Sequence, residues 1–307
     1  MASHSWEQLV TFTTDSVGLE RTFRLFHSVA QIIASFPSIL GLVIYFLEYS
    51  TSKPHSPVVT KSLLLALIQR LALGRRFIRL FRFLESFHSA HALYMNISQP
   101  QTPKASRDPT WVQTEAWLDV FGRTFNGMYL LLEATTIVNA LQIDGLAIWT
   151  QELERTITVE GQRFWLLSLV CGVLSGLLKM VQVMAYTPVP ATGDGFSHGK
   201  VEGHNETEKE KTDDPEVFDM KKEQERLRNI AKDRKKARGL WIREVRGKIH
   251  GLGRMVVANA LDIVLPGTVV GWIRLDPGTV GIAMFITTIL TGKEVWERCG
   301  REVAASK

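Results

Sequence analysis

The spacing of one acidic and two imidazole side chains comes closest to that of a chemical site. Glu85, His88 and His91 recur at every third residue, so that on a helix they share one face. Carboxylates and imidazoles are ligands for zinc. Because no fourth ligand or open catalytic position accompanies them, we favour interfacial or packing histidines over a metal site. We expect no bound metal and no cofactor.

A single acid within an apolar run is the second chemical feature. Asp262 lies in the stretch MVVANALDIVLPG, and an acid at membrane depth is by default a functional candidate. It can equally lie where the helix has not entered the lipid. The sequence has no HExxH, GxSxG or P-loop motif, and Gly251-Leu252-Gly253 lacks the third glycine of a dinucleotide loop. We therefore expect no catalytic residues and a protein that is not an enzyme.

The distribution of apolar residues points to a membrane protein. Hydrophobic residues make up 45% of the 307 residues and are gathered into a few long runs between charged stretches, which is typical of membrane proteins with exposed loops. The net charge of +5 suits an anionic phospholipid membrane. Because the basic residues lie beside apolar and aromatic ones, we expect no nucleic-acid partner.

The helical period of the apolar residues predicts an all-α, membrane-associated fold with four regions. These are an N-terminal helical region with a basic amphipathic helix (1–100), a middle helical region (101–190), a charged, partly disordered linker (191–240) and a C-terminal membrane hairpin (241–307). The second half of the linker is a basic, helix-forming run, and its first half has too little apolar surface to order itself.

Three segments are candidates for contact with the bilayer core. The helical region over 15–47 is interrupted by Pro37. The stretch 164–186 is the best span candidate, and its Gly172, Ser175 and Gly176 admit a close helix neighbour, including another copy of the chain. In the hairpin, two apolar halves are divided at 274–276. Basic residues on both outer flanks of the hairpin predict that both of its ends are cytosolic.

A basic amphipathic helix is expected within 61–95. Arginines lie on one side and apolar residues on the other, with Arg76 at the boundary. Such a helix can lie in the membrane plane, with phenylalanines at the acyl boundary and guanidinium groups on phosphates. A core helix with solvated arginines is the alternative. The candidate membrane-binding residues are Arg75, Arg76, Arg79, Arg82, Leu73, Phe77, Leu80, Phe81, Leu84 and Phe87.

Four segments in order resemble the peroxin-11 family across nearly the whole chain. GLERTFRLFHSVAQ is similar to the family's opening helix, and LALGRRFIRLFRFLESF to its basic amphipathic segment. FNGMYLLLEATTIVNALQIDG is similar to its middle signature, and the segment from Val257 to Trp296 to its closing hairpin. Glu133 stands where the family pattern has aspartate, and the charged insertion at about 195–238 is long. These two departures indicate a divergent fungal-type member.

The resemblance implies a peroxisomal membrane protein with both termini in the cytosol. Such a protein promotes peroxisome elongation, proliferation and fission by inserting its amphipathic helix and by self-association. The implied partners are other copies of the chain, its paralogues, and fission factors, namely a tail-anchored adaptor and a dynamin-related GTPase. A peroxisomal membrane pore for small metabolites is the alternative function, although polar residues such as Gln182, Asn259 and Asp262 are scattered rather than aligned.

Overall fold

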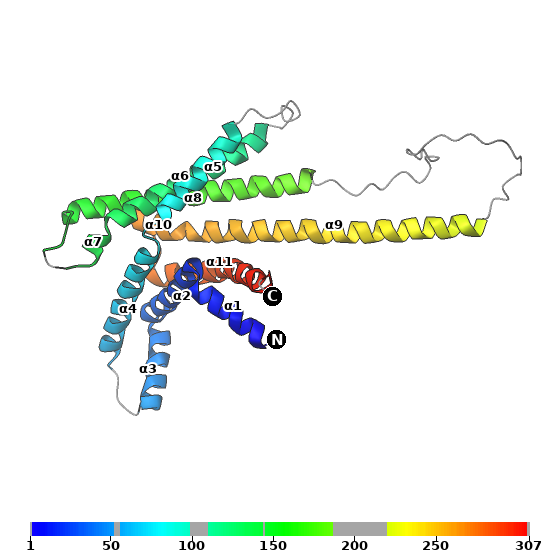
Figure 1. The fold of residues 1–307 in the computed structure, drawn as a ribbon. Helices are drawn as coiled ribbons and strands as arrows, with labels where there is room; N and C mark the ends of the chain where they lie inside the picture. Colours follow the sequence, from blue (N-terminus) through cyan, green and yellow to red (C-terminus); the bar gives the residue numbers. More distant parts are fainter. Residues whose placement is uncertain (1, 52–55, 99–109, 144, 187–219, 306–307) are drawn as a thin grey trace, which may run out of the picture. The chain divides into compact units, whose positions relative to one another are not determined.

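The computed structural model describes residues 2–51, 56–98, 110–143, 145–186 and 220–305. Every regular element in these ranges is a helix, and none of them contains a strand (Figure 1). The predicted all-α fold is therefore confirmed. The chain divides into two compact units, one of residues 1–180 with 252–307 and one of residues 181–251.

The smaller unit contains the C-terminal end of α8 (Gln151–Tyr186) and most of α9 (Met220–Asp262). The basic run expected at the end of the linker is helical from residue 220 onward. The first part of the expected linker, 191–219, lies outside the described residues.

The N-terminal helices are α1 (Ala2–Thr14), α2 (Ser16–Ser35) and α3 (Pro37–Thr51). Asp15 caps α2, because its Oδ2 accepts a hydrogen bond of 3.0 Å from the Gly18 N–H. The interruption predicted at Pro37 is confirmed: Phe36 is extended and α3 begins at the proline, so that α2 and α3 are bent by 102°.

The continuous amphipathic helix expected through Leu73 to Phe87, within 61–95, is wrong, because two helices share this segment. α4 (Pro57–Ile78) and α5 (Arg82–Ser98) are separated by a turn at 79–81. α4 packs against α2, whereas α5 packs against α6 (Thr110–Thr135). One straight helix could not meet both partners, so the break follows from tertiary packing.

The C-terminal hairpin is present as predicted. α9 is followed by α10 (Val264–Val270), and α10 contacts α11 (Pro277–Ala305) across a turn. The turn begins at Gly271, whose φ of 87° is left-handed and suits glycine. It ends at Asp276, which accepts hydrogen bonds from the Thr279 hydroxyl and N–H at 2.8 and 2.9 Å. These bonds lower the pKa of Asp276.

The remaining contacts of the larger unit surround α2. α11 packs along α2, and α1 packs against both of them. At the end of α1, the Phe12 ring meets Trp296 edge-on at 5.6 Å, and Gln8 donates to the Trp296 carbonyl at 2.8 Å. The short α7 (Ile137–Ala140) follows α6 and contacts α4.

The small residues of α8 meet a helix of the same chain. A Cβ on Gly172 would lie 2.7 Å from the Asn259 side chain, and one on Gly176 would lie 2.5 Å from Val256. The Ser175 hydroxyl is buried and donates to Asp119 at 2.5 Å. The close neighbour that these residues admit is therefore α9, with α6 beside it.

Several helices are long and apolar enough to cross a membrane. Among the described residues these are Pro57–Ile78, Gln151–Ala185 and Arg228–Val270, with the bent pair α2 and α3 as a fourth if it forms one span. The predicted span candidate at 164–186 lies within the second of them. No residue in the apolar window of Pro57–Ile78 is buried, although α4 packs against α2.

The close contact between α1 and α2 makes Gly18 a sensitive position. A Cβ there would lie 2.0 Å from the Phe12 carbonyl oxygen. We expect Gly18→Ala to lower the free energy of unfolding by about 1–3 kcal/mol, because the backbone itself must shift. Denaturant unfolding of the full chain in detergent measures this. Gly41→Ala in α3 is the control, since nothing lies within 4 Å of its Cβ; equal stability of the two variants would contradict the prediction.

Candidate functional site

Six charged side chains from four helices and a turn form a network inside the larger unit, here called the central charge cluster. Its members are Glu20, Arg24, Arg75, Arg79, Glu133 and Asp262. The carboxylates come from α2, α6 and α9, and the guanidinium groups come from α2, α4 and the turn after α4. The cluster therefore links helices that are distant in the sequence.

One deeply buried pair joins α2 to α9. Arg24 is 3% exposed and donates to Asp262, which is 7% exposed. The same guanidinium group donates to the Thr287 hydroxyl of α11 at 3.0 Å, and that hydroxyl is fully buried. Arg24 thus holds three helices together. Asp262 serves as the counter-ion of a neighbouring helix, which explains an acid in an apolar stretch.

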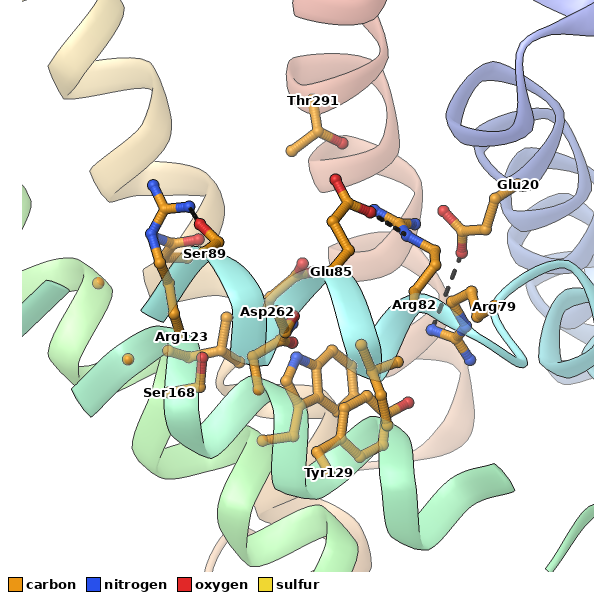
Figure 2. Close-up of a pocket in the computed structure, with 18 of the residues that line it drawn as sticks. Glu20, Arg79, Arg82, Glu85, Ser89, Arg123, Tyr129, Ser168, Asp262 and Thr291 are labelled. Carbon is orange, nitrogen blue, oxygen red and sulfur yellow. Dashed lines mark hydrogen bonds and ion pairs between the residues drawn. The ribbon is translucent and has the colours of Figure 1, made fainter. Parts of the chain in front are cut away.

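The second part of the cluster joins α2 to α4 and α6. Arg75 donates through Nε to Glu20 Oε1 at 3.0 Å. Arg79 lies 4.0 Å from the same oxygen, as Figure 2 shows. Arg79 also donates to Glu133 at 2.8 Å, and the Tyr129 hydroxyl donates to Glu133 at 3.0 Å. Burial raises the pKa of Tyr129 to about 12, so the phenol keeps its proton for this bond at neutral pH.

The structure gives the four candidate arginines different surroundings. Arg75 and Arg79 belong to the central charge cluster, and Arg76 lies 4.0 Å from Glu133. Arg82 forms an i,i+3 pair with Glu85 at 3.9 Å, and Glu85 is largely exposed (Figure 2). All four arginines therefore have a carboxylate of the chain within 4.0 Å, but Arg75 and Arg79 are only 10% and 14% exposed, whereas Arg76 and Arg82 are 30% and 32% exposed. Contact of any of them with anionic lipid stays a prediction.

The six candidate apolar residues also differ in how far their side chains are exposed. Phe77, Phe81 and Leu84 are exposed, with Phe81 at 70% and Leu84 at 57%. Leu73 and Leu80 are half-buried. Phe87 packs on Gly127 of α6, where an added Cβ would lie 2.8 Å from its ring. The turn at 79–81 thus exposes the middle of the predicted apolar face and buries its end against α6.

A polar cavity of about 460 Å³ lies beside the central charge cluster within the larger unit. Side chains from α2, α5, α6, α8, α9 and α11 line it (Figure 2). Five of the lining residues are arginines, namely Arg21, Arg24, Arg79, Arg82 and Arg123, and four are acids, namely Glu20, Glu85, Asp119 and Asp262. The rest include serines, asparagines, Tyr129 and Trp165.

The triplet of Glu85, His88 and His91 is not gathered into a ligand set. In the part of the chain that the structure describes, no group of three or more His, Cys, Asp or Glu side chains is placed to hold a metal ion. Glu85 instead pairs with Arg82 at the cavity.

Sequence reasoning missed the partners of the arginines. Glu20 and Arg24 belong to an amphipathic segment in which charges are ordinarily solvated, and their burial follows only from the packing of α4, α9 and α11 around α2. Two signals were available. Asp262 stands in an apolar stretch, and Glu133 interrupts the apolar run MYLLLEATTIV; buried acids of this kind need a cationic partner.

The fold and the site define a helical membrane protein built around buried ion pairs. The chain matches the family model described as Peroxisomal biogenesis factor 11 (PEX11) over residues 6–296, and it belongs to this family. Comparison with curated proteins gave no match, and neither did comparison with solved structures.

Family membership gives the chain a role in peroxisome biogenesis. The family is associated with the peroxisomal membrane and comprises biogenesis factors rather than known enzymes. The resemblance inferred from four short segments is therefore confirmed over most of the chain.

The Arg24–Asp262 pair provides a test of the cluster. We expect Arg24→Met to lower the free energy of unfolding by about 3–5 kcal/mol, because Asp262 is left as a buried, unpaired charge. Arg24→Met combined with Asp262→Leu should cost less than the sum of the single changes, with a coupling energy of about 1–3 kcal/mol. Denaturant unfolding of the full chain in detergent measures all three variants.

Arg163→Met is the matched control, because Arg163 pairs with Glu160 at the surface and such pairs contribute little. Additive effects of the Arg24 and Asp262 changes would show that the two side chains do not stabilise one another.

Proposed function

We propose that this chain elongates the peroxisomal membrane before fission by inserting an apolar hairpin, formed by α3 and α4, into the cytosolic leaflet. The observation that carries the proposal is the exposure of this hairpin. The two helices lie against each other (Figure 1). No residue in the span-length window of α4 is buried, although the helix packs against α2 and α3, and Val58 and Leu63 are 78% and 65% exposed.

The side chains of α3 support the same interpretation. Leu42, Tyr45, Phe46 and Tyr49 are each more than two-thirds exposed, and patches of this kind mark interaction or membrane surfaces. Tyrosine suits the membrane–water boundary, because its ring is apolar and its hydroxyl is polar. Apolar side chains wedged into one leaflet expand it relative to the other, which favours curvature.

The amphipathic segment after α4 extends this surface. Phe77, Phe81 and Leu84 are exposed, and Arg76 and Arg82 remain about one-third exposed beside them. In the proposal the three apolar side chains enter the acyl boundary, while these two arginines meet anionic headgroups. Arg75 and Arg79 instead hold α4 to α2 and α6. The membrane-binding set is thus narrower than the ten residues predicted from the sequence.

Both termini are proposed to be cytosolic. The packing of α1 on α11 near Trp296 supports their lying on the same side of the membrane. The proposal includes self-association, with paralogues and with the fission factors as further partners, as the family resemblance implies. Since Gly172 and Gly176 already face α9, contact between copies is expected to use another surface.

A metabolite pore is the second candidate function, and the polar cavity is the observation that favours it. Most of its charged lining residues are, however, engaged in ion pairs between helices. A pore would release small solutes from sealed vesicles without changing their shape, whereas the proposed activity changes their shape without releasing solutes.

The apolar hairpin can be tested with the full chain and vesicles containing anionic lipid. We expect Leu42→Lys with Phe46→Lys to abolish insertion and tubulation, because each lysine costs about 2.5–3.5 kcal/mol at mid-bilayer. Electron microscopy measures tubulation and flotation measures binding. The control, Gln151→Lys with Thr156→Lys, adds the same charge at exposed positions of α8 and should tubulate as the unaltered chain does. Tubulation by the hairpin variant would refute the proposal.

The two partly exposed arginines make a separate prediction. Arg76→Gln with Arg82→Gln should weaken binding to anionic vesicles, because each arginine near such a surface contributes about 1 kcal/mol. Binding to neutral vesicles should be unchanged. Flotation with the two kinds of vesicle measures the difference, and equal loss on both would indicate an effect on folding instead.

A further inference from the structure

We infer that the polar cavity beside the central charge cluster is a binding site for a phosphate group. The inference goes beyond the proposed membrane activity, which uses the outer surface of α3 and α4 and of the amphipathic segment after α4. The cavity lies between helices of the larger unit and is lined mainly by side chains that donate hydrogen bonds or carry positive charge (Figure 2).

The first argument is the gathering of guanidinium groups at one cavity. Arg21 and Arg24 come from α2, Arg79 from the turn after α4, Arg82 from α5 and Arg123 from α6, and all five line the cavity. The Nε–H groups of Arg21, Arg24 and Arg79 are inaccessible, so an acceptor in the cavity would meet the terminal N–H groups of these side chains. Each guanidinium group presents several such donors in a fixed plane.

The second argument is the balance of charge. Near the cavity, Arg24 is matched by Asp262, Arg75 by Glu20 and Arg79 by Glu133, and Lys179 is shared by Asp119 and Glu115. Arg82 is matched by Glu85 at the exposed edge. Among the described residues this pairing leaves Arg21 and Arg123 without a carboxylate of their own, and these seven cations exceed the six acids by one positive charge.

The contacts of Arg21 and Arg123 agree with this charge balance. Arg21 lies 3.5 Å from Glu20, a carboxylate that it shares with Arg75. Arg123 donates to the Ser89 hydroxyl (Figure 2). The lining therefore carries positive charge that its own acids do not neutralise.

A phosphate monoester matches both features. It carries between one and two negative charges at neutral pH and has three terminal acceptor oxygens, and guanidinium groups bind such oxygens with strong, directional hydrogen bonds. The serine and asparagine side chains of the lining, such as Ser168 and Asn126, can donate to further oxygens. The group could belong to a phosphorylated lipid headgroup or to free phosphate, and the chemistry of recognition is the same.

The test uses the full chain in nanodiscs of phosphatidylcholine, which contains no phosphate monoester. Inorganic phosphate is the first probe. A water-soluble short-chain phosphatidylinositol 4-phosphate is the second, and short-chain phosphatidylinositol without the monoester is its reference. Titration calorimetry measures affinity for the unaltered chain, for Arg21→Gln and for Arg123→Gln. Arg155→Gln is the control, because Arg155 is an exposed arginine of α8 that does not line the cavity.

We expect saturable binding of a phosphate monoester to the unaltered chain and to Arg155→Gln, weakened at least tenfold in each cavity variant. Binding of inorganic phosphate would identify free phosphate as a sufficient ligand, whereas binding of the lipid probe alone would identify a headgroup. No saturable binding of either probe would overturn the inference in favour of a water-filled cavity. Equal affinity in all four proteins would also overturn it.

Two controls keep these results interpretable. Arg123 is exposed, so Arg123→Gln should unfold at the same temperature as the unaltered chain and decides the outcome if Arg21→Gln does not fold. Vesicle tubulation by Arg123→Gln should be normal, because the cavity is separate from the apolar hairpin. Failure of the phosphate site would therefore leave the proposed membrane activity standing, and failure of tubulation would leave the site standing.

Discussion

The arrangement of the larger unit depends on charge pairing around α2. Arg24 holds α9 and α11 to this helix, and Glu20 holds α4 to it. Burying such ions costs a large desolvation free energy, which is recovered only when partners and hydrogen bonds are in place. The pairs therefore add little net stability, but they require α2 to pack against its neighbours in one register. A shift of α2 by one residue would leave several charges buried and unpaired.

Because of this charge pairing, charged side chains lie inside and apolar side chains lie outside, which is the reverse of the arrangement usual in soluble helical proteins. Part of the charged side of α4 faces inward, toward Glu20, while no residue in the apolar window of the same helix is buried. The break at 79–81 continues this pattern, because it brings Arg79 to two carboxylates and exposes Phe81. A chain with ion pairs inside and aromatic rings outside is suited to a lipid surface, where apolar side chains are the favoured ones.

Much of the fold followed from local features of the sequence. Pro37 removes a backbone donor and excludes the helical conformation before it, so the break between α2 and α3 was predictable. The charged interruption at 274–276 and the two apolar halves around it predicted the hairpin, because a turn there exposes the polar residues. The turn at 79–81 could not be predicted in this way. LGRRFIRLFRFLE contains no proline, and its only glycine, Gly74, lies well before the break, so the chain turns there because α4 and α5 have different partners.

By itself the sequence determined the all-α class, the apolar segments and the family, because helical period, hydrophobic length and motif order are properties of neighbouring residues. It also identified Asp262 as an acid in an apolar stretch. Only the tertiary structure decided what the arginines do. Arg24 and Asp262 are 238 residues apart, and Arg75 and Glu20 are 55 apart. On a helical projection a solvated arginine and a buried one look alike, and the difference arises only when another helix brings a carboxylate within reach.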